Sequence, residues 1–137
     1  MKRACLSETG TPVARQVTQG LEAQGWNVRL RTEGPAPDLR VEFLEAAGSR
    51  LGSTGEADCS SLILVAPAAG RMALAALSLH TQQRAVAAAP SQRVNAIAFE
   101  AGHTDKLAVT IDWLAKANMV TGQLILLSDQ PAPYGVI

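Results

Sequence analysis

Two histidines offer the clearest side chains for acid–base or metal chemistry. His103 lies two residues before Asp105, and in a hydrolase such a pair would activate a nucleophile. The sequence places no nucleophile beside this pair. We therefore expect Thr104 or Asp105 to cap a helix and His103 to be exposed. His80 lies in the middle of a long predicted helix, where we expect it on a solvent or partner face.

The two cysteines, Cys5 and Cys59, each lie in or beside a predicted strand. A metal site built on them would need histidines at ligand spacing, and neither histidine offers that spacing. Free cysteine is among the residues most often buried. The sequence therefore predicts two buried, reduced thiols and no metal site.

A turn after the first predicted strand is where chemistry with a phosphate could occur. A dinucleotide turn uses three glycines, because its backbone must approach a pyrophosphate that rests on a helix N-terminus. Within residues 7–14 only Gly10 remains. Glu8 brings negative charge toward a phosphate position, and Pro12 removes a donor N–H. We expect no resident cofactor, and NAD or NADP is the ligand to test.

Strands and helices alternate along the chain, which predicts βα units and a mostly parallel sheet. Pro12 suits the first position of a helix, and Gly25 suits the residue after its end. Strands are predicted at 3–6, 26–31, 50–57, 62–66, 94–99 and 123–128, with helices from 12 to about Gly25, at 71–88 and at 105–116.

Residues 38–47 fit two patterns. Leu39, Val41 and Phe43 alternate as in a strand, whereas Leu39, Phe43 and Ala47 also fit one face of a helix. We favour the helix, capped by Asp38 and ended by Gly48, because helices and strands then alternate throughout.

Composition excludes several classes of protein. The formal net charge is zero, and aromatic residues make up 4% of the chain, so no electrostatic or stacking surface for nucleic acid is evident. No apolar run approaches the length of a membrane span, and the apolar stretch at the N-terminus is too short for a signal peptide. We expect a cytoplasmic protein, with residues 1–137 forming one domain.

Two late segments, Arg93–Ala98 (RVNAIA) and Val120–Asp129 (VTGQLILLSD), resemble signatures of the short-chain dehydrogenase/reductase family. Residues 2–30 resemble that family's opening strand, turn, helix and second strand. Ala57-Asp58-Cys59 resembles the Ala-Asp-Val that ends its third strand. Leu62–Gly70 resembles its fourth strand and Asn-Asn-Ala-Gly motif, with both asparagines lost. The resemblance implies a three-layer, doubly wound Rossmann-like sheet of about six mostly parallel strands.

The family's catalytic pair, Tyr-x-x-x-Lys on one helix, is not present. The single tyrosine is Tyr134, and the lysines Lys2, Lys106 and Lys116 do not follow it. Counting back from Asn95 places the two catalytic positions near Ala69 and Ala73, which cannot transfer a proton. We assign no catalytic residue, and enzymatic activity is not expected.

The resemblance also implies where a dinucleotide would bind in this chain. The crevice would lie at the carboxyl ends of the strands. Its expected lining is Ser7, Thr9, Gly10, Thr11, Asp58 and Ala66, where Asp58 corresponds to the family's aspartate near the adenine.

The long helix at 71–88 carries apolar and small residues along its length. In the family this helix lies in a bundle across a dimer axis. We expect an interface formed by Met72, Ala75, Ala76, Leu79, Gln83 and Val86. The leading hypothesis is a pseudoenzyme acting as a homodimer, or as a partner of a full-length dehydrogenase, through this helix and the C-terminal strand. The alternative is a nucleotide- or NAD(P)-binding sensor module, and a more remote one is a divergent NAD(P)-dependent oxidoreductase.

Overall fold

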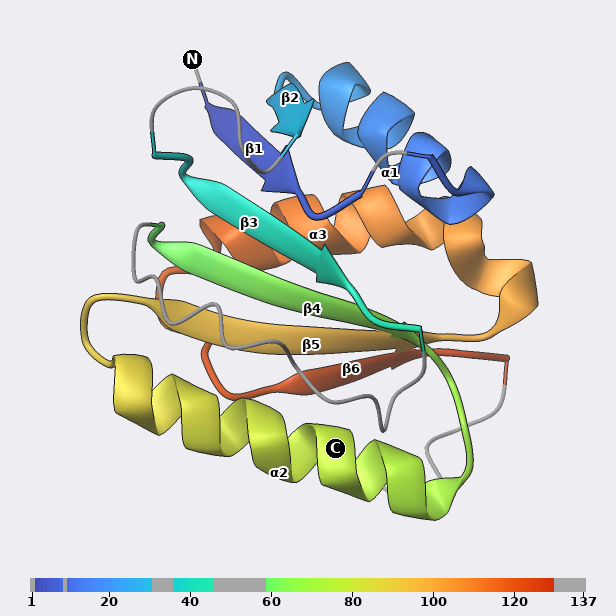
Figure 1. Ribbon diagram of the computed structural model, residues 1–137, viewed down its shortest axis with the longest axis vertical. Helices are drawn as coiled ribbons and strands as arrows, with labels where there is room; N and C mark the ends of the chain where they lie inside the picture. The colour runs from blue at the N-terminus through green and yellow to red at the C-terminus, as the bar shows by residue number, and fades with distance from the viewer. Residues whose placement is uncertain (1, 9, 31–35, 46–58, 130–137) are drawn as a thin grey trace.

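Six parallel strands form one sheet in the computed structural model, which describes residues 2–8, 10–30, 36–45 and 59–129 (Figure 1). Their order is β2-β1-β3-β4-β5-β6. The strands are β1 (Arg3–Leu6), β2 (Asn27–Leu30), β3 (Leu39–Phe43), β4 (Ser61–Pro67), β5 (Arg93–Phe99) and β6 (Leu124–Leu127). The helices are α1 (Pro12–Ala23), α2 (Arg71–Ala88), the 3₁₀ helix η1 (Ala101–Lys106) and α3 (Leu107–Lys116). The predicted Rossmann-like architecture is confirmed.

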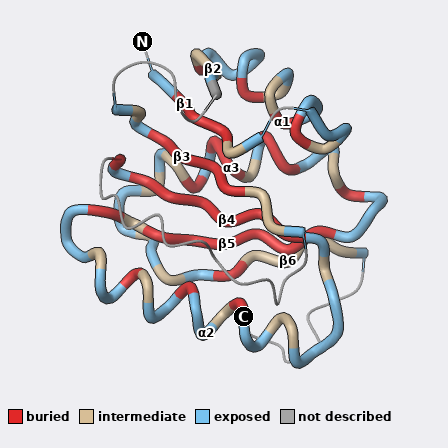
Figure 2. Tube along the Cα trace, in the orientation of Figure 1, coloured by how far each residue is buried: buried red, intermediate tan, exposed pale blue. Residues whose placement is uncertain are grey.

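Helices cover both faces of the sheet. Helices α1 and α3 pack on one face, against a cluster that includes Ile63, Val65 and Ile97 (Figure 1). Helix α2 packs on the other face, against a cluster that includes Leu62 and Leu64. Because neighbouring residues of one strand face opposite covered sides, β4 is apolar from Leu62 onward and buried except at Pro67 (Figure 2).

The first helix forms as predicted. Pro12 is its first residue, and Thr11 is the N-cap, whose Oγ1 accepts a hydrogen bond from the Ala14 N–H at 3.1 Å. Gly25 follows the helix with φ +94°, a backbone conformation that glycine adopts without strain. The two cysteines are also as predicted, since both are buried and neither forms a disulfide.

The helix predicted at 38–47 is wrong, because residues 39–43 form β3. This strand is hydrogen-bonded between β1 and β4, and Leu39 and Val41 are fully buried in the core. Asp38 caps no helix, since its carboxylate accepts a hydrogen bond from the Arg3 N–H at 2.9 Å. Hydrogen bonding to β1 on one side and to β4 on the other favours the strand over the helix. The local sequence could not reveal these two neighbours. The strand predicted at 50–57 lies outside the described residues.

The place of β3 changes the comparison with the dinucleotide-binding plan. In the usual order, 3-2-1-4-5-6, the fourth strand lies beside the first. Here β3 takes that position, and β4 takes the fifth. The assignment of residues 62–70 to the family's fourth strand is therefore wrong. In the described part of the chain, no strand lies outside β2.

The third helix begins later than predicted. Residues 101–106 form η1, and α3 begins at Leu107, after Lys106 and without a side-chain cap. The predicted cap by Thr104 or Asp105 is therefore wrong. The glycine at position 20 lets α1 approach α3 closely, because a Cβ atom there would lie 2.3 Å from the Cβ of Ala108.

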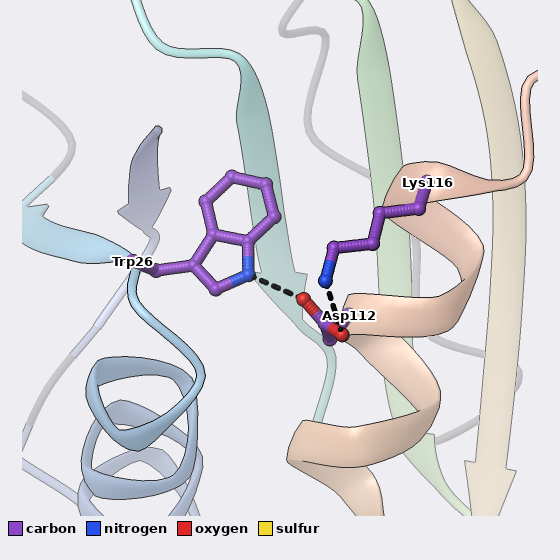
Figure 3. Close-up of polar contacts among 3 residues, drawn as sticks. All are labelled: Trp26, Asp112 and Lys116. Atoms are coloured by element: carbon purple, nitrogen blue, oxygen red, sulfur yellow. Dashed lines mark hydrogen bonds and ion pairs between the residues drawn. The ribbon is translucent and has the colours of Figure 1, made fainter. Parts of the chain in front are cut away.

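A buried polar link also joins α3 to the turn before β2 (Figure 3). The indole N–H of Trp26 donates to Asp112 Oδ1 at 2.8 Å, and Lys116 Nζ lies 3.0 Å from Asp112 Oδ2. Trp26 and Asp112 are 6% and 9% exposed. Lys2 Nζ also lies 5.5 Å from the centroid of the Trp26 ring. A buried carboxylate is thus satisfied by two donors.

We expect Trp26→Phe to lower the free energy of unfolding by about 1–2 kcal/mol, because it removes one donor from a buried carboxylate. Denaturant titration of the purified variant measures this change. Trp113→Phe is the matched control, since Trp113 is 56% exposed and should change stability little. Equal effects of the two substitutions would contradict the role given to the Trp26–Asp112 hydrogen bond.

Candidate functional site

The segment that resembles a dehydrogenase signature most strongly has a structural role. Asn95 is fully buried, its Nδ2 donates to the Val120 carbonyl and its Oδ1 accepts from the Gln123 N–H, each at 3.1 Å. Thr121 Oγ1 accepts from the Val94 N–H at 3.0 Å. These bonds fix the connection from α3 to β6 against the start of β5.

Arg93 also holds the C-terminus of α3 at this edge of the sheet. Its guanidinium donates to the carbonyls of Leu114, Ala115 and Ala117, at 3.2, 3.1 and 2.8 Å, and so caps the C-terminus of α3. These residues lie at the amino ends of β5 and β6. Ligands of open α/β sheets bind at the opposite edge, beyond the carboxyl ends of the strands.

That opposite edge has its switch point between β1 and β3, because β2 lies on one side of β1 and β3 on the other. Ser7 follows β1 directly and joins the two strands there. Its N–H donates to the Val41 carbonyl at 2.9 Å, and its Oγ accepts from the Phe43 N–H at 2.9 Å. The hydroxyl predicted to line a cofactor crevice therefore joins the carboxyl ends of β1 and β3.

The N-terminus of α1, where a pyrophosphate would rest, is capped by the chain itself. Thr11 Oγ1 donates to Glu8 Oε1 at 3.2 Å while it accepts from the Ala14 N–H. Pro12 contributes no N–H. Gly10 is exposed, and neither a positive φ nor a close neighbour requires glycine there. A carboxylate and a side-chain cap thus stand where a dinucleotide needs free N–H donors, so these residues do not fit that cofactor.

The other residues predicted around the crevice are not brought together in the described structure. Ala66 is fully buried in β4 and packs in the cluster under α2, one strand away from the switch point. Thr9 and Asp58 lie outside the described residues. The predicted set is therefore placed only in part, with Ser7, Gly10 and Thr11 at the end of β1.

The two positions expected to carry acid–base chemistry are alanines at the start of α2. Ala69 is exposed immediately before the N-cap Gly70, and Ala73 is half-buried in the first turn. Neither side chain can accept or deliver a proton near neutral pH.

Polar side chains lie close together where β5 and β6 end, and the sequence analysis did not predict this cluster. His103 is 7% exposed, which contradicts the predicted exposure, and its Nε2 lies 3.1 Å from Asp129 Oδ1. Ser128 Oγ donates to Glu100 Oε1, so a carboxylate holds this hydroxyl. The sequence could have indicated this cluster. Glu100 and His103 follow β5, Ser128 and Asp129 follow β6, and these two strands are parallel neighbours. Among the residues described, no group of side chains could hold a metal ion.

The outer face of α2 is exposed (Figure 2) and carries three large apolar side chains. Met72, Leu79 and Val86 are 86%, 56% and 80% exposed, while Leu77 and Ala85 on the inner face are buried. The residues predicted to form an interface are all exposed, namely Met72, Ala75, Ala76, Leu79, Gln83 and Val86. His80 is exposed on the same helix, as predicted.

A second apolar surface lies at the amino end of β6. An open depression of about 400 Å³ is lined by Trp113, Met119, Val120, Thr121, Gln123, Leu124 and Ile125. It lies at the edge of the sheet opposite to the switch-point crevice. None of the helices described is long and apolar enough to cross a membrane.

A parallel sheet covered by helices on both faces, with a switch point beside its first strand, defines a Rossmann-like α/β protein. The chain belongs to the SDR-like family of short chain dehydrogenase-like proteins, whose profile matches residues 33–127. The resemblance predicted from the late signature segments is thereby confirmed. A search of curated proteins found no match.

Solved structures share the fold at low sequence identity. The protein lin1944 from Listeria innocua has a TM-score of 0.68 and 12% identity, over 93% of this chain and 100% of its own. A short chain dehydrogenase/reductase from Brucella ovis has a TM-score of 0.64 and 18% identity over the same shares. FolM alternative dihydrofolate reductase 1 from Brucella suis, solved with NADP, has a TM-score of 0.63 and 14% identity, over 98% and 99%.

Proposed function

We propose that this protein is a non-catalytic member of the SDR-like family that acts by association, as a homodimer joined through the outer face of α2. The observation that carries the proposal is the exposed apolar stripe of Met72, Leu79 and Val86. A contiguous apolar stripe that one chain leaves exposed often marks a protein–protein interface. The sheet covers only the inner side of α2 within one chain.

The spacing of the stripe favours a second copy of the same helix. Met72 and Val86 each lie seven residues from Leu79, so all three project along one face, two turns apart. If two copies pack antiparallel, Leu79 meets Leu79 of the other copy on the two-fold axis, and Met72 meets Val86. Such an interface is self-complementary, as an isologous dimer requires. Ala75 and Ala76 beside Leu79 leave room for close helix approach.

The start of α2 supports the non-catalytic part of the proposal. Ala69 and Ala73 stand where a proton donor and its lysine would be needed. Several structural neighbours are described as oxidoreductases, two of them with NADP and one with a partially ordered NAD, yet their identity to this chain is 18% or less. That likeness supports the fold, whereas the activity has to be argued from this chain's own residues.

Leu79→Glu should convert the dimer into a monomer, because it places two carboxylates against each other at the axis. We expect the dissociation constant of the dimer to rise about thirtyfold or more, as for a central hot-spot residue. Sedimentation equilibrium at micromolar concentration measures it. Val109→Glu is the matched control, since Val109 is an exposed apolar residue (59%) on α3 and should leave the dimer intact.

A native protein that stays monomeric at these concentrations would refute the homodimer. If it then bound a full-length dehydrogenase and Leu79→Glu abolished that binding, α2 would serve a different partner. The non-catalytic part has its own test. Reduction of any carbonyl compound in a panel, linked to oxidation of NADH or NADPH, would refute it.

A further inference from the structure

We infer that Glu8 is a built-in anion at the N-terminus of α1 and makes the switch-point crevice exclude phosphate groups. This inference does not depend on how the chain associates. It concerns the edge of the sheet beyond β1 and β3, whereas the proposed dimer interface lies on α2.

The position of the carboxylate is fixed by a short chain of hydrogen bonds. Glu8 Oε1 accepts from the Thr11 hydroxyl at 3.2 Å, and the same hydroxyl accepts from the Ala14 N–H at 3.1 Å. Thr11 is the N-cap of α1, so the carboxylate lies beside the positive end of the helix dipole. A phosphate at that place would meet both an occupied cap and a like charge.

A second observation, independent of charge, concerns the same crevice. Ser7 bridges β1 and β3 through its bonds to Val41 and Phe43, at the point where the strand connections diverge. The N–H groups of Ser7 and Phe43 are therefore donors already in use by the protein. Pro12 removes one further N–H from the first turn of α1.

The charge of Glu8 can be removed by substitution while Ser7 and Pro12 stay unchanged. Ser7 and Pro12 limit the donors that a phosphate can use, whereas the carboxylate of Glu8 repels a phosphate through its charge. Neutralising Glu8 should therefore restore measurable anion binding at the helix end without rebuilding a glycine-rich turn. The gain should shrink as salt is added, because exposed charges are screened.

Calorimetric titration with ADP at low ionic strength tests the inference, using the native chain, Glu8→Gln and Glu22→Gln. Glu22 lies in the last turn of the same helix, so its substitution changes the net charge equally but far from the crevice. We expect no saturable binding to the native chain or to Glu22→Gln. We expect saturable binding of ADP to Glu8→Gln, with an affinity at least about tenfold above the detection limit that the other two proteins set.

Micromolar binding of ADP by the native chain would overturn the inference. So would binding by Glu8→Gln that is no tighter than native, or an equal gain in Glu22→Gln, which would reduce the effect to net charge. Circular dichroism of each variant, compared with the native spectrum, establishes that α1 remains folded in the protein that is titrated. None of these outcomes depends on whether the chain forms a dimer.

Discussion

Replacing Asn95 with alanine should lower the free energy of unfolding by about 3 kcal/mol, as measured by denaturant titration. Asn95 is fully buried, and its side chain serves both as donor to the Val120 carbonyl and as acceptor from the Gln123 N–H. The substitution removes both bonds and leaves two backbone groups of the α3–β6 connection without their partner. Buried polar groups in that state each cost a substantial part of their desolvation energy.

Asn118→Ala is the control, because Asn118 is an exposed asparagine at the end of the same connection. It should change stability by no more than about 0.5 kcal/mol. Asn95→Asp separates the two bonds, since a carboxylate keeps the acceptor and loses the donor. A loss for Asn95→Ala as small as that of the exposed control would show that the asparagine does not fasten this connection.

Asn95 lies in the segment that resembles a dehydrogenase signature, and its role there is structural. Arg93, Asn95 and Thr121 hold α3 and β6 at the amino edge of the sheet, where they support the fold. The carboxyl edge, where such folds bind ligands, instead has alanines at the acid–base positions and a carboxylate at the helix end.

Local signals predicted much of the architecture from the sequence. Pro12 and Gly25 marked the limits of α1, and α2 spans residues 71–88 as predicted. The continuous apolar runs in β4 and β6 indicated strands covered on both faces. The exposed stripe on α2 also followed from the sequence, because its residues recur at helical spacing and belong to one element.

Features that depend on distant partners could not be predicted in this way. Residues 39–43 carry both strand and helix spacing, and the choice is made by hydrogen bonds to β1 and β4. His103 was expected in solvent because Thr104 and Asp105 are good capping residues, but it is buried and paired with Asp129, twenty-six positions away. The bridge from Ser7 to Phe43 likewise joins residues that only the sheet order brings together.

The close contact of α1 with α3 gives the other large effect. Gly20→Leu should lower the free energy of unfolding by about 3 kcal/mol, because even its Cβ would lie 2.3 Å from the Cβ of Ala108. The helix propensity of leucine exceeds that of glycine by roughly 1 kcal/mol, so the expected loss is net of that gain. Thermal or denaturant unfolding measures it.

Gln19→Leu provides the control, since Gln19 is the exposed neighbour on α1 and the new side chain meets no helix. It should be neutral or slightly stabilising. A double-mutant cycle then tests the contact itself. Ala108→Gly removes the opposing methyl group, so Gly20→Ala should cost less in that background than alone, with a coupling of about 1 kcal/mol. Strict additivity would mean that α3 moves away from α1 instead, and that the helix pair is held by the Trp26–Asp112 link without requiring the glycine.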